Sequence, residues 1–312
     1  MAYEPPLVSV ILPCFNCEAT LERAFASVGR QDYPAIEIIA IDDGSTDGTA
    51  DILTAHEKVG VRVIRLQRNS GAAVARNAGL AAASGDYVAF LDADDEWLPG
   101  KLLRQMAVIA ARPAMSFVAA NASVVDCQGQ IAESSYDELL PADPAAAWKV
   151  LLADTFVWTP TVLARRAAIV RTGGFDPAFV IGEDQDLWIR LALLGEVGYI
   201  GDVVAIVHEQ AASLTRRSVA RLLDDIVPMV RRHVAAQRHR LTDAEVKNIL
   251  GRRYTRVGRN AYLEFPLRGA ALIIKAMLLG YAPIENAAYL VTASPLARWA
   301  KRRVLTRKLF SQ

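Results

Sequence analysis

The sequence predicts an α/β protein: a doubly wound, mostly parallel (mixed) sheet flanked by helices, followed by a helical C-terminal region. Two observations lead to this prediction. Along the first half of the chain, short β-branched apolar runs alternate with Ala-rich or amphipathic stretches, which is the pattern of βαβ units. From residue 216 onward the β-type runs stop and helical patterns continue. The 312 residues, 53% hydrophobic and 22% charged, are typical of a globular protein with a sizeable core.

The apolar runs predict strands and the stretches between them predict helices of at least about three turns. The predicted strands are 7–12, 36–41, 61–66, 87–91 and 117–121. The predicted helices are 18–30, 48–59 and 71–84. The stretch from 143 to 213 is expected to mix helices with short strands.

A domain boundary is predicted near Thr215. Residues 1–215 would form one domain with two halves, 1–95 and 96–215, and residues 216–312 a helical appendage. Repeats, low-complexity tracts and long Gly/Ser linkers are absent from the sequence. The helical region is therefore expected to pack on the first domain as an appendage rather than hang from it as a tethered module.

The charge and the N-terminus exclude some classes of protein. A net charge of +1 argues against a protein that coats nucleic acid, because such proteins carry a clear basic excess. Residues 1–6 lack the basic and apolar regions of a secretion signal, so we expect a cytoplasmic address. Cys14 and Cys17 form a CxxC with no second ligand pair at zinc spacing, and we interpret them as small buried thiols.

The C-terminus suggests a membrane surface. Residues 269–280 are too short an apolar stretch to span a bilayer. Residues 298–308 hold six Lys or Arg residues and no acid, interleaved with Trp299, Val304 and Leu305. Such a segment either lies on the anionic inner face of the membrane or is a solvated helix end, and the sequence leaves both interpretations open.

Three predicted loops at the carboxyl ends of strands carry the polar residues of interest. In doubly wound sheets ligands bind beyond these ends. The first loop begins at Pro13, the second contains Asp42 and Asp43, and the loop after the fourth predicted strand contains Asp92 and Asp94. We expect all three loops to face one crevice.

Asp92 and Asp94 would place two carboxylates on one face of an extended segment. Two converging carboxylates repel each other unless a cation lies between them, and hard oxygen ligands suit Mg²⁺ or Mn²⁺, which bind diphosphates. An acidic triplet alone is commonly a plain turn, so the surrounding sequence must decide.

The second acidic loop supplies that context. Gly44 permits a tight turn and Asp47 can cap the next helix. We expect no such structural role for Asp42 and Asp43 at the strand tip. A carboxylate there accepts hydrogen bonds, as the N–H of a uracil ring would require.

With these features in series the chain resembles a family-2 inverting glycosyltransferase of the GT-A fold. The segments that carry the resemblance cover about the first two thirds of the chain: VSVILPCFNCEATLERAFASVGRQDYP, IIAIDDGSTDGT, RNSGAAVARNAGLAAASGDYVAFLDADD and RRAAIVRTGGFDPAFVIGEDQDLWIRL. The resemblance implies that 1–95 is a nucleotide-binding half and 96–215 an acceptor half.

The resemblance also assigns roles to individual positions. The nucleotide is assigned to Pro13, Asp42, Asp43, Asn69, Arg76 and Asp92. Asp94 would bind Mn²⁺ or Mg²⁺. His208 would contact this metal or the diphosphate, with Ser213 and Thr215 following in the family's pattern, although a lone His is more often structural.

The catalytic base of the family follows a GGFD turn, here 173–176. Asp184 is the candidate, and it also opens an apolar helix, so a capping role competes with catalysis. Glu183 or Asp186 would serve a helix start equally well. A single displacement with Asp184 as base would invert the anomeric configuration.

The resemblance implies transfer of one sugar from a nucleotide sugar, with a lean toward UDP, to a hydroxyl of a glycan or lipid-linked acceptor in bacterial surface-glycan assembly. Processive synthases carry transmembrane helices and a QxxRW motif, which this sequence lacks. Two alternatives stay open. A nucleotidyltransferase normally has a Gly-rich basic loop after its first strand, and PCFNCEAT lacks both features. A catalytically inactive nucleotide-sugar-binding protein would have lost acids that are present here.

Overall fold

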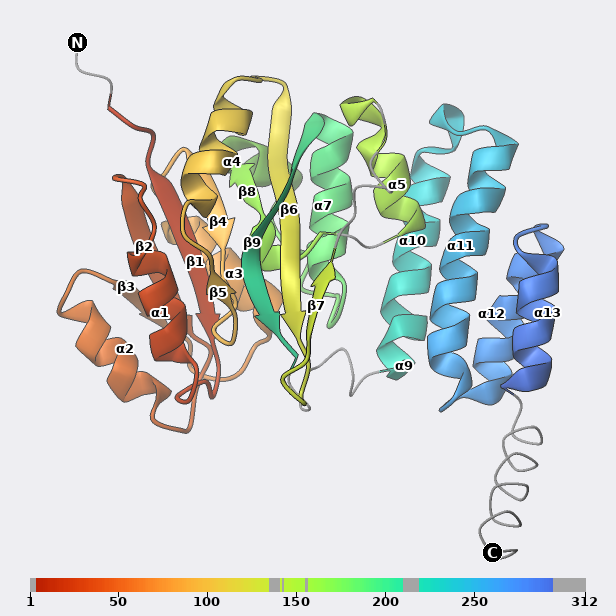
Figure 1. Ribbon diagram of the computed structural model, residues 1–312, viewed down its shortest axis with the longest axis horizontal. Coiled ribbons are helices and arrows are strands. Elements are labelled where there is room, and N and C mark those ends of the chain that lie inside the picture. The colour runs from red at the N-terminus through yellow and green to blue at the C-terminus, as the bar shows by residue number, and fades with distance from the viewer. Residues whose placement is uncertain (1–3, 135–140, 142, 155–156, 210–218, 294–312) are drawn as a thin grey trace, which may run out of the picture. The chain divides into compact units, whose positions relative to one another are not determined.

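A computed structural model describes residues 4–134, 141, 143–154, 157–209 and 219–293. The chain divides into two compact units, Met1–Leu151 with Thr155–Ser213 and Leu152–Asp154 with Leu214–Gln312. The predicted boundary at Thr215 and the basic stretch 298–308 lie outside the described residues, so the catalytic domain and its appendage stay a prediction. Each unit is described by itself below (Figure 1).

The first unit is built on a mixed sheet. Its strands are β1 (Val8–Cys14), β2 (Ile36–Asp42), β3 (Arg62–Arg65), β4 (Tyr87–Phe90), β5 (Glu96–Trp97), β6 (Met115–Val125), β7 (Ile131–Ser134), β8 (Leu163–Arg165) and β9 (Glu196–His208). Among the described residues these nine strands follow the order β3-β2-β1-β4-β8-β6-β9-β5, with β7 paired to β6. The predicted strands correspond to β1, β2, β3, β4 and β6.

The direction of the strands follows the prediction for a doubly wound sheet. β1 lies between β2 and β4 and is parallel to both, and β3 continues the parallel part beside β2. β8 then runs antiparallel between β4 and β6, which makes the sheet mixed. Because the parallel strands β1, β2 and β4 end at one edge, the three polar loops that follow them also lie at that edge.

Helices cover this sheet. Those of the first unit are α1 (Leu21–Gly29), α2 (Thr49–Glu57), α3 (Ala72–Ala82), α4 (Lys101–Ala110), α5 (Ala147–Ala153), α6 (Arg166–Thr172) and α7 (Glu183–Leu194), with single turns η2 (Pro144–Ala146) and η3 (Thr159–Thr161). The three predicted helices correspond to α1, α2 and α3. Helix α3 packs closely on the sheet, because a Cβ at Gly79 would lie 2.7 Å from Ile11.

The expectation of short strands between 143 and 213 was wrong for β9, which has 13 residues. Gly198, Gly201 and Asp202 interrupt its apolar pattern and hide its length in the sequence. In the structure β9 pairs with β6 in parallel, and register shifts near Asn121 absorb the interruption. The strand therefore continues to His208 at the edge that carries the polar loops.

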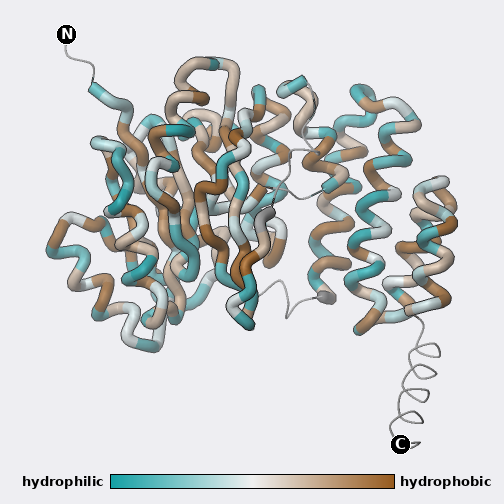
Figure 2. The backbone as a smooth tube through the Cα atoms, in the orientation of Figure 1, coloured by the Kyte–Doolittle hydropathy of each residue, from teal (hydrophilic) through white to brown (hydrophobic). Residues whose placement is uncertain are grey.

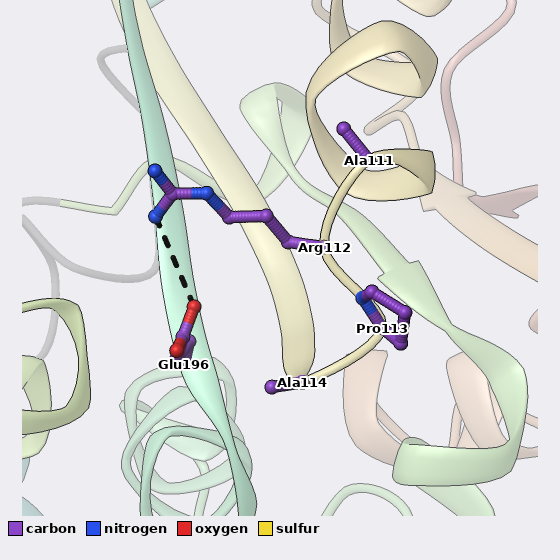
Figure 3. A pocket seen from close by; sticks show the side chains of 5 residues that line it. All are labelled: Ala111, Arg112, Pro113, Ala114 and Glu196. Carbon is purple, nitrogen blue, oxygen red and sulfur yellow. Dashed lines mark ion pairs between the residues drawn. The ribbon is translucent and has the colours of Figure 1, made fainter.

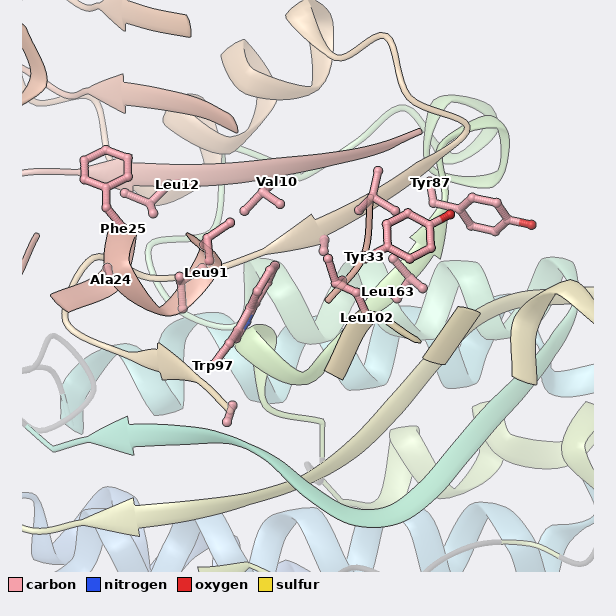
Figure 4. Close-up of a cluster of buried hydrophobic side chains, with 14 of the residues drawn as sticks. Val10, Leu12, Ala24, Phe25, Tyr33, Tyr87, Leu91, Trp97, Leu102 and Leu163 are labelled. Carbon is pink, nitrogen blue, oxygen red and sulfur yellow. The ribbon is translucent and has the colours of Figure 1, made fainter. Parts of the chain in front are cut away.

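The hydrophobic core gathers around the parallel strands. Figure 4 shows Val10 and Leu12 of β1 with Phe25 of α1 and Trp97 of β5 in one cluster of buried side chains. Trp97 is fully buried. In Figure 2 hydrophobic residues follow the strands, whereas most of helix α11 (Asp243–Tyr262) is hydrophilic.

The described part of the second unit is helical, as predicted. It contains α9 (Val219–Arg221), the π-turn η4 (Leu222–Ile226), α10 (Val227–Ala236), the turn η5 (Arg238–Arg240), α11, α12 (Pro266–Leu278) and α13 (Pro283–Thr292). Thr242 and Glu245 form a capping box at the start of α11. No helix within the described ranges is both long and apolar enough to cross a membrane.

Candidate active site

The loops that follow β1 and β2 are joined by hydrogen bonds. The Asn16 side chain accepts the Thr46 N–H at 2.8 Å, and the Asn16 N–H donates to the Ser45 hydroxyl at 3.1 Å. The Asp43 N–H donates to the Cys14 carbonyl at 2.8 Å. Pro13 lies half-buried near the end of strand β1, just before this junction. Two of the three expected loops therefore share one surface.

Asp42 and Asp43 have structural partners, contrary to the expectation from the sequence. Asp42 accepts the Ser45 N–H at 2.9 Å. Asp43 accepts the N–H groups of Ser70 and Gly71, both at 2.8 Å, one on each carboxylate oxygen. These two amides lie just before α3, where a helix start leaves backbone N–H groups without partners inside the helix. The sequence pattern did not show that Asp43 would accept them. Each carboxylate oxygen has a second lone pair, so a nucleobase N–H can still be accepted.

Asn69 lies in the exposed loop before α3, where its side-chain oxygen accepts the Gly71 N–H at 3.2 Å. Gly71 has a φ of 91°, a conformation that favours glycine. The loop therefore brings Asn69 beside Asp43. This is the side of the molecule on which the resemblance predicts the nucleotide.

The third loop crowds three carboxyl groups. Burial and the neighbouring Asp92 raise the pKa of Asp94. Burial together with Asp92 and Asp94 raises the pKa of Asp95 well above its usual range. Arg23 and His208 oppose these shifts only in part. The positive groups near the loop offset the burial of Asp94 and Asp95 only in part, and the carboxylate oxygens are ligands of the kind that Mn²⁺ and Mg²⁺ prefer.

His208 lies at this same loop. The backbone N–H of His208 donates to the Asp95 carboxylate at 3.0 Å, and the ring nitrogen Nε2 lies 3.0 Å from the Glu96 carboxylate. Arg23 donates to the backbone carbonyl of Asp94. Within the described ranges, however, no three His, Cys, Asp or Glu side chains form a preorganised metal cluster. The metal roles of Asp94 and His208 therefore stay predictions.

Arg76 joins the third loop to the helix that carries the candidate base. Its guanidinium nitrogens lie 2.7 Å from Asp92 and 2.7 Å from Glu183. Arg76 is 5% exposed and lies over the ring of Phe175 at 5.4 Å. Burial lowers the pKa of Arg76, but Asp92, Glu183 and Asp184 together raise it above its ordinary value, so the guanidinium is charged at every relevant pH. The residue assigned to the nucleotide thus also bridges two parts of the site.

The GGFD turn is fixed by Asn77, which follows Arg76 on α3. The Asn77 side chain donates to the Phe175 carbonyl at 2.7 Å and accepts the Phe175 N–H at 2.9 Å. Gly174 has a φ of 78°, and a Cβ there would lie 2.6 Å from the Asn77 oxygen. The turn therefore requires glycine and directs the chain toward α7.

Asp184 and Glu183 have opposite surroundings in the first turn of α7. Asp184 is half-buried, and its carboxylate accepts the Thr159 hydroxyl at 2.9 Å and the Gln185 N–H at 2.6 Å. Glu183 is buried and paired with Arg76, and burial with the neighbouring Asp184 raises the pKa of Glu183 to about 7. Solvent access favours Asp184 as the group that meets an acceptor. The N-cap position of α7 is Gly182, so Asp184 is not the N-cap residue, but its contact with the Gln185 N–H satisfies a donor of the first turn as a cap does.

The structure brings the predicted residues into three connected groups. Asp42, Asp43 and Asn69 surround the first two loops, Asp94 and His208 lie at the third, and Arg76 links Asp92 to the helix of Asp184. Sequence reasoning missed Arg23, Asn77 and Thr159. Asn77 stands beside Arg76 in a segment that carried the resemblance, whereas Thr159 shows no local signal because its role depends on a residue 25 positions later.

A separate pocket of about 340 Å³ lies where α4 ends and β6 and β9 begin. Figure 3 shows Arg112 and Glu196 across it, with their charged groups 3.9 Å apart. Because β6 and β9 are parallel, this pocket lies at the opposite ends of the strands from His208. It does not belong to the site.

Comparison with known proteins agrees with the resemblance. The family model described as Glycosyl transferase family 2 matches residues 9–162. The Bacillus subtilis protein TuaG, named for teichuronic acid biosynthesis, is 37% identical over 198 residues, which are 62% of this chain and 75% of TuaG. The Escherichia coli UDP-Glc:α-D-GlcNAc-diphosphoundecaprenol β-1,3-glucosyltransferase WfgD is 29% identical over 59% of this chain and 69% of its own.

Solved structures show the same fold. Staphylococcus aureus TarS 1–349 in complex with UDP has a TM-score of 0.58 and 21% identity, covering 94% of this chain and 92% of that one. The mannosyltransferase PcManGT from Pyrobaculum calidifontis, in complex with GDP-Man and Mn²⁺, has a TM-score of 0.60 and 22% identity, covering 98% and 84%. The predicted GT-A fold is confirmed.

Proposed function

The chain belongs to glycosyl transferase family 2, and we propose that it moves a single sugar from a nucleotide sugar, with UDP as the favoured nucleotide, to a hydroxyl of a glycan or lipid-linked acceptor with inversion at the anomeric carbon. That it is a glycosyltransferase follows from the family. The donor, the acceptor and the stereochemistry are the proposal. We place it in the assembly of bacterial surface polysaccharides, which the names of TuaG and WfgD support.

The observation that carries the proposal is the bridge through Arg76. One buried guanidinium contacts Asp92 in the loop predicted to face the donor and Glu183 beside the half-exposed Asp184. The bridge fixes the donor loop relative to the carboxylate that would act on the acceptor. An inverting transfer needs a base close to the sugar that the donor presents, and the bridge supports such a place for Asp184.

In the proposed reaction the acceptor oxygen attacks the anomeric carbon while the Asp184 carboxylate takes the proton of that hydroxyl. The bond from the anomeric carbon to the diphosphate oxygen breaks in the same displacement, so the configuration inverts. Pro13 and Asp43 would hold the nucleobase with Asp42 beside it, Asn69 and Arg76 would close over the nucleotide, and Asp92 would touch the ribose. The charge of Arg76 keeps Asp92 and Glu183 in place.

A divalent cation is part of the proposal. Asp94 would hold Mn²⁺ or Mg²⁺, with His208 near it, and when bound the cation would neutralise charge on the leaving diphosphate. The raised pKa values of Asp94 and Asp95, caused by burial and neighbouring carboxylates, support a site at which a cation would relieve repulsion. The Mn²⁺ in the complex of PcManGT points in the same direction.

We also propose peripheral contact of the C-terminal region with the inner face of the cell membrane. The undecaprenol acceptor in the name of WfgD supports a lipid-linked substrate. Residues 298–308 carry six basic residues and no acid. Helix α12 exposes 88% of Leu267 and 82% of Leu278, with Lys275 also exposed between them. Apolar and basic side chains together are typical of helices that lie on an anionic bilayer.

The experiment that tests the reaction replaces the base. Asp184→Asn keeps the size of the side chain but does not accept a proton, so kcat should fall by about 10² to 10⁴ while donor affinity stays near wild type. The control is Asp202→Asn, which changes an exposed acid on β9 and should leave kcat unchanged.

The wild-type product should also be examined by NMR for its anomeric configuration, after a screen of nucleotide sugars for thermal protection with and without Mn²⁺. A product that kept the configuration of the donor would overturn the single displacement. An Asp184→Asn enzyme with near-normal turnover would move the base elsewhere.

A further inference from the structure

The turn η3, before strand β8, lies against the candidate base. We infer that Thr159 in this turn is a positioning residue that orients Asp184 through the hydrogen bond from its hydroxyl. The inference rests on the proposed function, in which Asp184 is the catalytic base. Thr159 itself would not touch either substrate.

The two oxygens of Asp184 receive separate donors. The Thr159 hydroxyl donates to Oδ2 at 2.9 Å, and the Gln185 N–H donates to Oδ1 at 2.6 Å. One donor on each oxygen fixes the rotation of the carboxylate plane. Each oxygen keeps a further lone pair for the proton of an acceptor. Thr159 is 5% exposed, whereas Asp184 reaches solvent, so the contact holds the base from its buried side.

The other polar residues in the first turns of α7 are fixed by different partners. Glu183 pairs with Arg76, and the Asp186 carboxylate lies 2.7 Å from Arg190. These contacts hold the helix, but they do not set the orientation of the Asp184 side chain. The hydroxyl of Thr159 does so together with the Gln185 N–H.

The turn that carries Thr159 is itself held by buried donors. They bind consecutive carbonyl groups: Trp97 Nε1 donates to Pro160 O at 2.8 Å, Gln105 Nε2 to Thr161 O at 2.6 Å, and Lys101 Nζ to Val162 O at 3.4 Å. All three donors are fully buried. Burial is costly for such groups, above all for a lysine amine, unless they are hydrogen-bonded. Two of these donors bind the turn itself and the third binds the residue directly after it, so Thr159 has a rigid support.

Rigid support matters because catalysis by a base depends on geometry. A displacement of about 1 Å from the productive position reduces a rate by up to about 10²-fold. Pro160 also fixes the backbone directly after Thr159. The Thr159 contact is therefore suited to set the direction from which Asp184 meets the acceptor hydroxyl.

The test compares Thr159→Val, which keeps the shape but removes the hydroxyl, with Thr159→Ser, which keeps the hydroxyl. In Thr159→Val we expect kcat to fall roughly 10- to 100-fold, the effect of one hydrogen bond to a charged group, with the KM for the donor unchanged. Thr159→Ser should recover most of the rate.

The matched control is Thr255→Val, which removes a buried hydroxyl that accepts from Asn286 in α13 at 2.9 Å. It should lower the unfolding temperature without changing kcat. Thr159→Val is also combined with Asp184→Asn. If Thr159 acts through Asp184, the second change should add almost nothing to the loss in kcat.

The outcomes separate the inference from the function on which it rests. Wild-type kcat in a folded Thr159→Val enzyme, or an equal further loss in the Asp184→Asn background, would overturn the positioning role and leave Asp184 as the base. Near-normal turnover in Asp184→Asn would instead overturn the proposed function.

Discussion

At the scale of single residues, the buried pair of Glu183 and Arg76 shows how burial and charge compete. The carboxylate has a guanidinium at 2.7 Å, yet the pKa of Glu183 is raised to about 7 because burial outweighs the attraction. The ordinary value is 4.5. Between these two values the folded state binds more protons than the unfolded state. The contribution of Glu183 to stability is therefore lost as the pH rises through about 7.

This linkage predicts the behaviour of Glu183→Gln. The variant is neutral at every pH and keeps an oxygen for Arg76. The free energy of unfolding of the variant, relative to that of the wild type, should therefore increase as the pH rises from 5 to 8. The gain should be on the order of 1 to 3 kcal/mol. Denaturant unfolding at several pH values measures it. The exposed Glu264→Gln is the control, and a difference from wild type that stays flat with pH would contradict the assignment.

A second residue-level prediction concerns Asp94. Burial and Asp92 raise the pKa of the Asp94 carboxyl, so an uncharged Asn should not destabilise the fold. Asp94→Asn should abolish transfer and metal-dependent nucleotide binding at an unchanged unfolding temperature. Calorimetric titration with UDP, with and without Mn²⁺, measures the binding. Full activity in the variant, or of wild type in excess chelator, would exclude the metal-dependent mechanism.

At the scale of elements, helices α11 and α12 approach each other through glycine. A Cβ at Gly258 would lie 2.9 Å from the carbonyl of Gly269, and a Cβ at Gly269 would lie 2.6 Å from the backbone of Tyr262. Backbone atoms do not move aside as the end of a flexible side chain does. Each position therefore sets the distance between the two helices.

Gly269→Ala should consequently destabilise the second unit by about 1 to 3 kcal/mol, the range for overpacked interiors. Thermal unfolding followed by circular dichroism measures the change. Gly29→Ala is the control, since an added Cβ there meets nothing within 4 Å. Equal unfolding temperatures for the Gly269 variant and wild type would show that the helices separate without cost.

Local patterns predicted the elements well, because strand and helix periodicity is written in neighbouring residues. They predicted β1, β2, β4 and the acidic loops after them. They did not predict that Arg76 would bridge Asp92 and Glu183, because this contact joins residues 107 positions apart. Nor did they indicate that the backbone N–H groups before α3 would donate hydrogen bonds to the Asp43 carboxylate. Such tertiary contacts depend on how distant segments pack together, which the pattern within one segment does not predict.

At the scale of the whole molecule, the basic C-terminus gives a further prediction. Each Lys or Arg near an anionic bilayer contributes about 1 kcal/mol, so removal of residues 298–312 should release the protein from anionic vesicles. Sedimentation with vesicles at low salt measures binding, and neutral vesicles are the control. If the intact protein does not bind anionic vesicles, residues 298–312 are a solvated end.

The bridge between Arg76 and Glu183 also sets an order of events during synthesis. All residues assigned to the nucleobase and ribose lie before residue 96, whereas Asp184 is made much later. At about 5 to 20 residues per second the ribosome needs roughly 10 to 40 seconds to reach Asp184, counted from the first residue. Closing the 107-residue separation then costs about 4 kcal/mol of chain entropy. A nascent chain therefore carries the residues assigned to the nucleobase and ribose before it carries the proposed catalytic base.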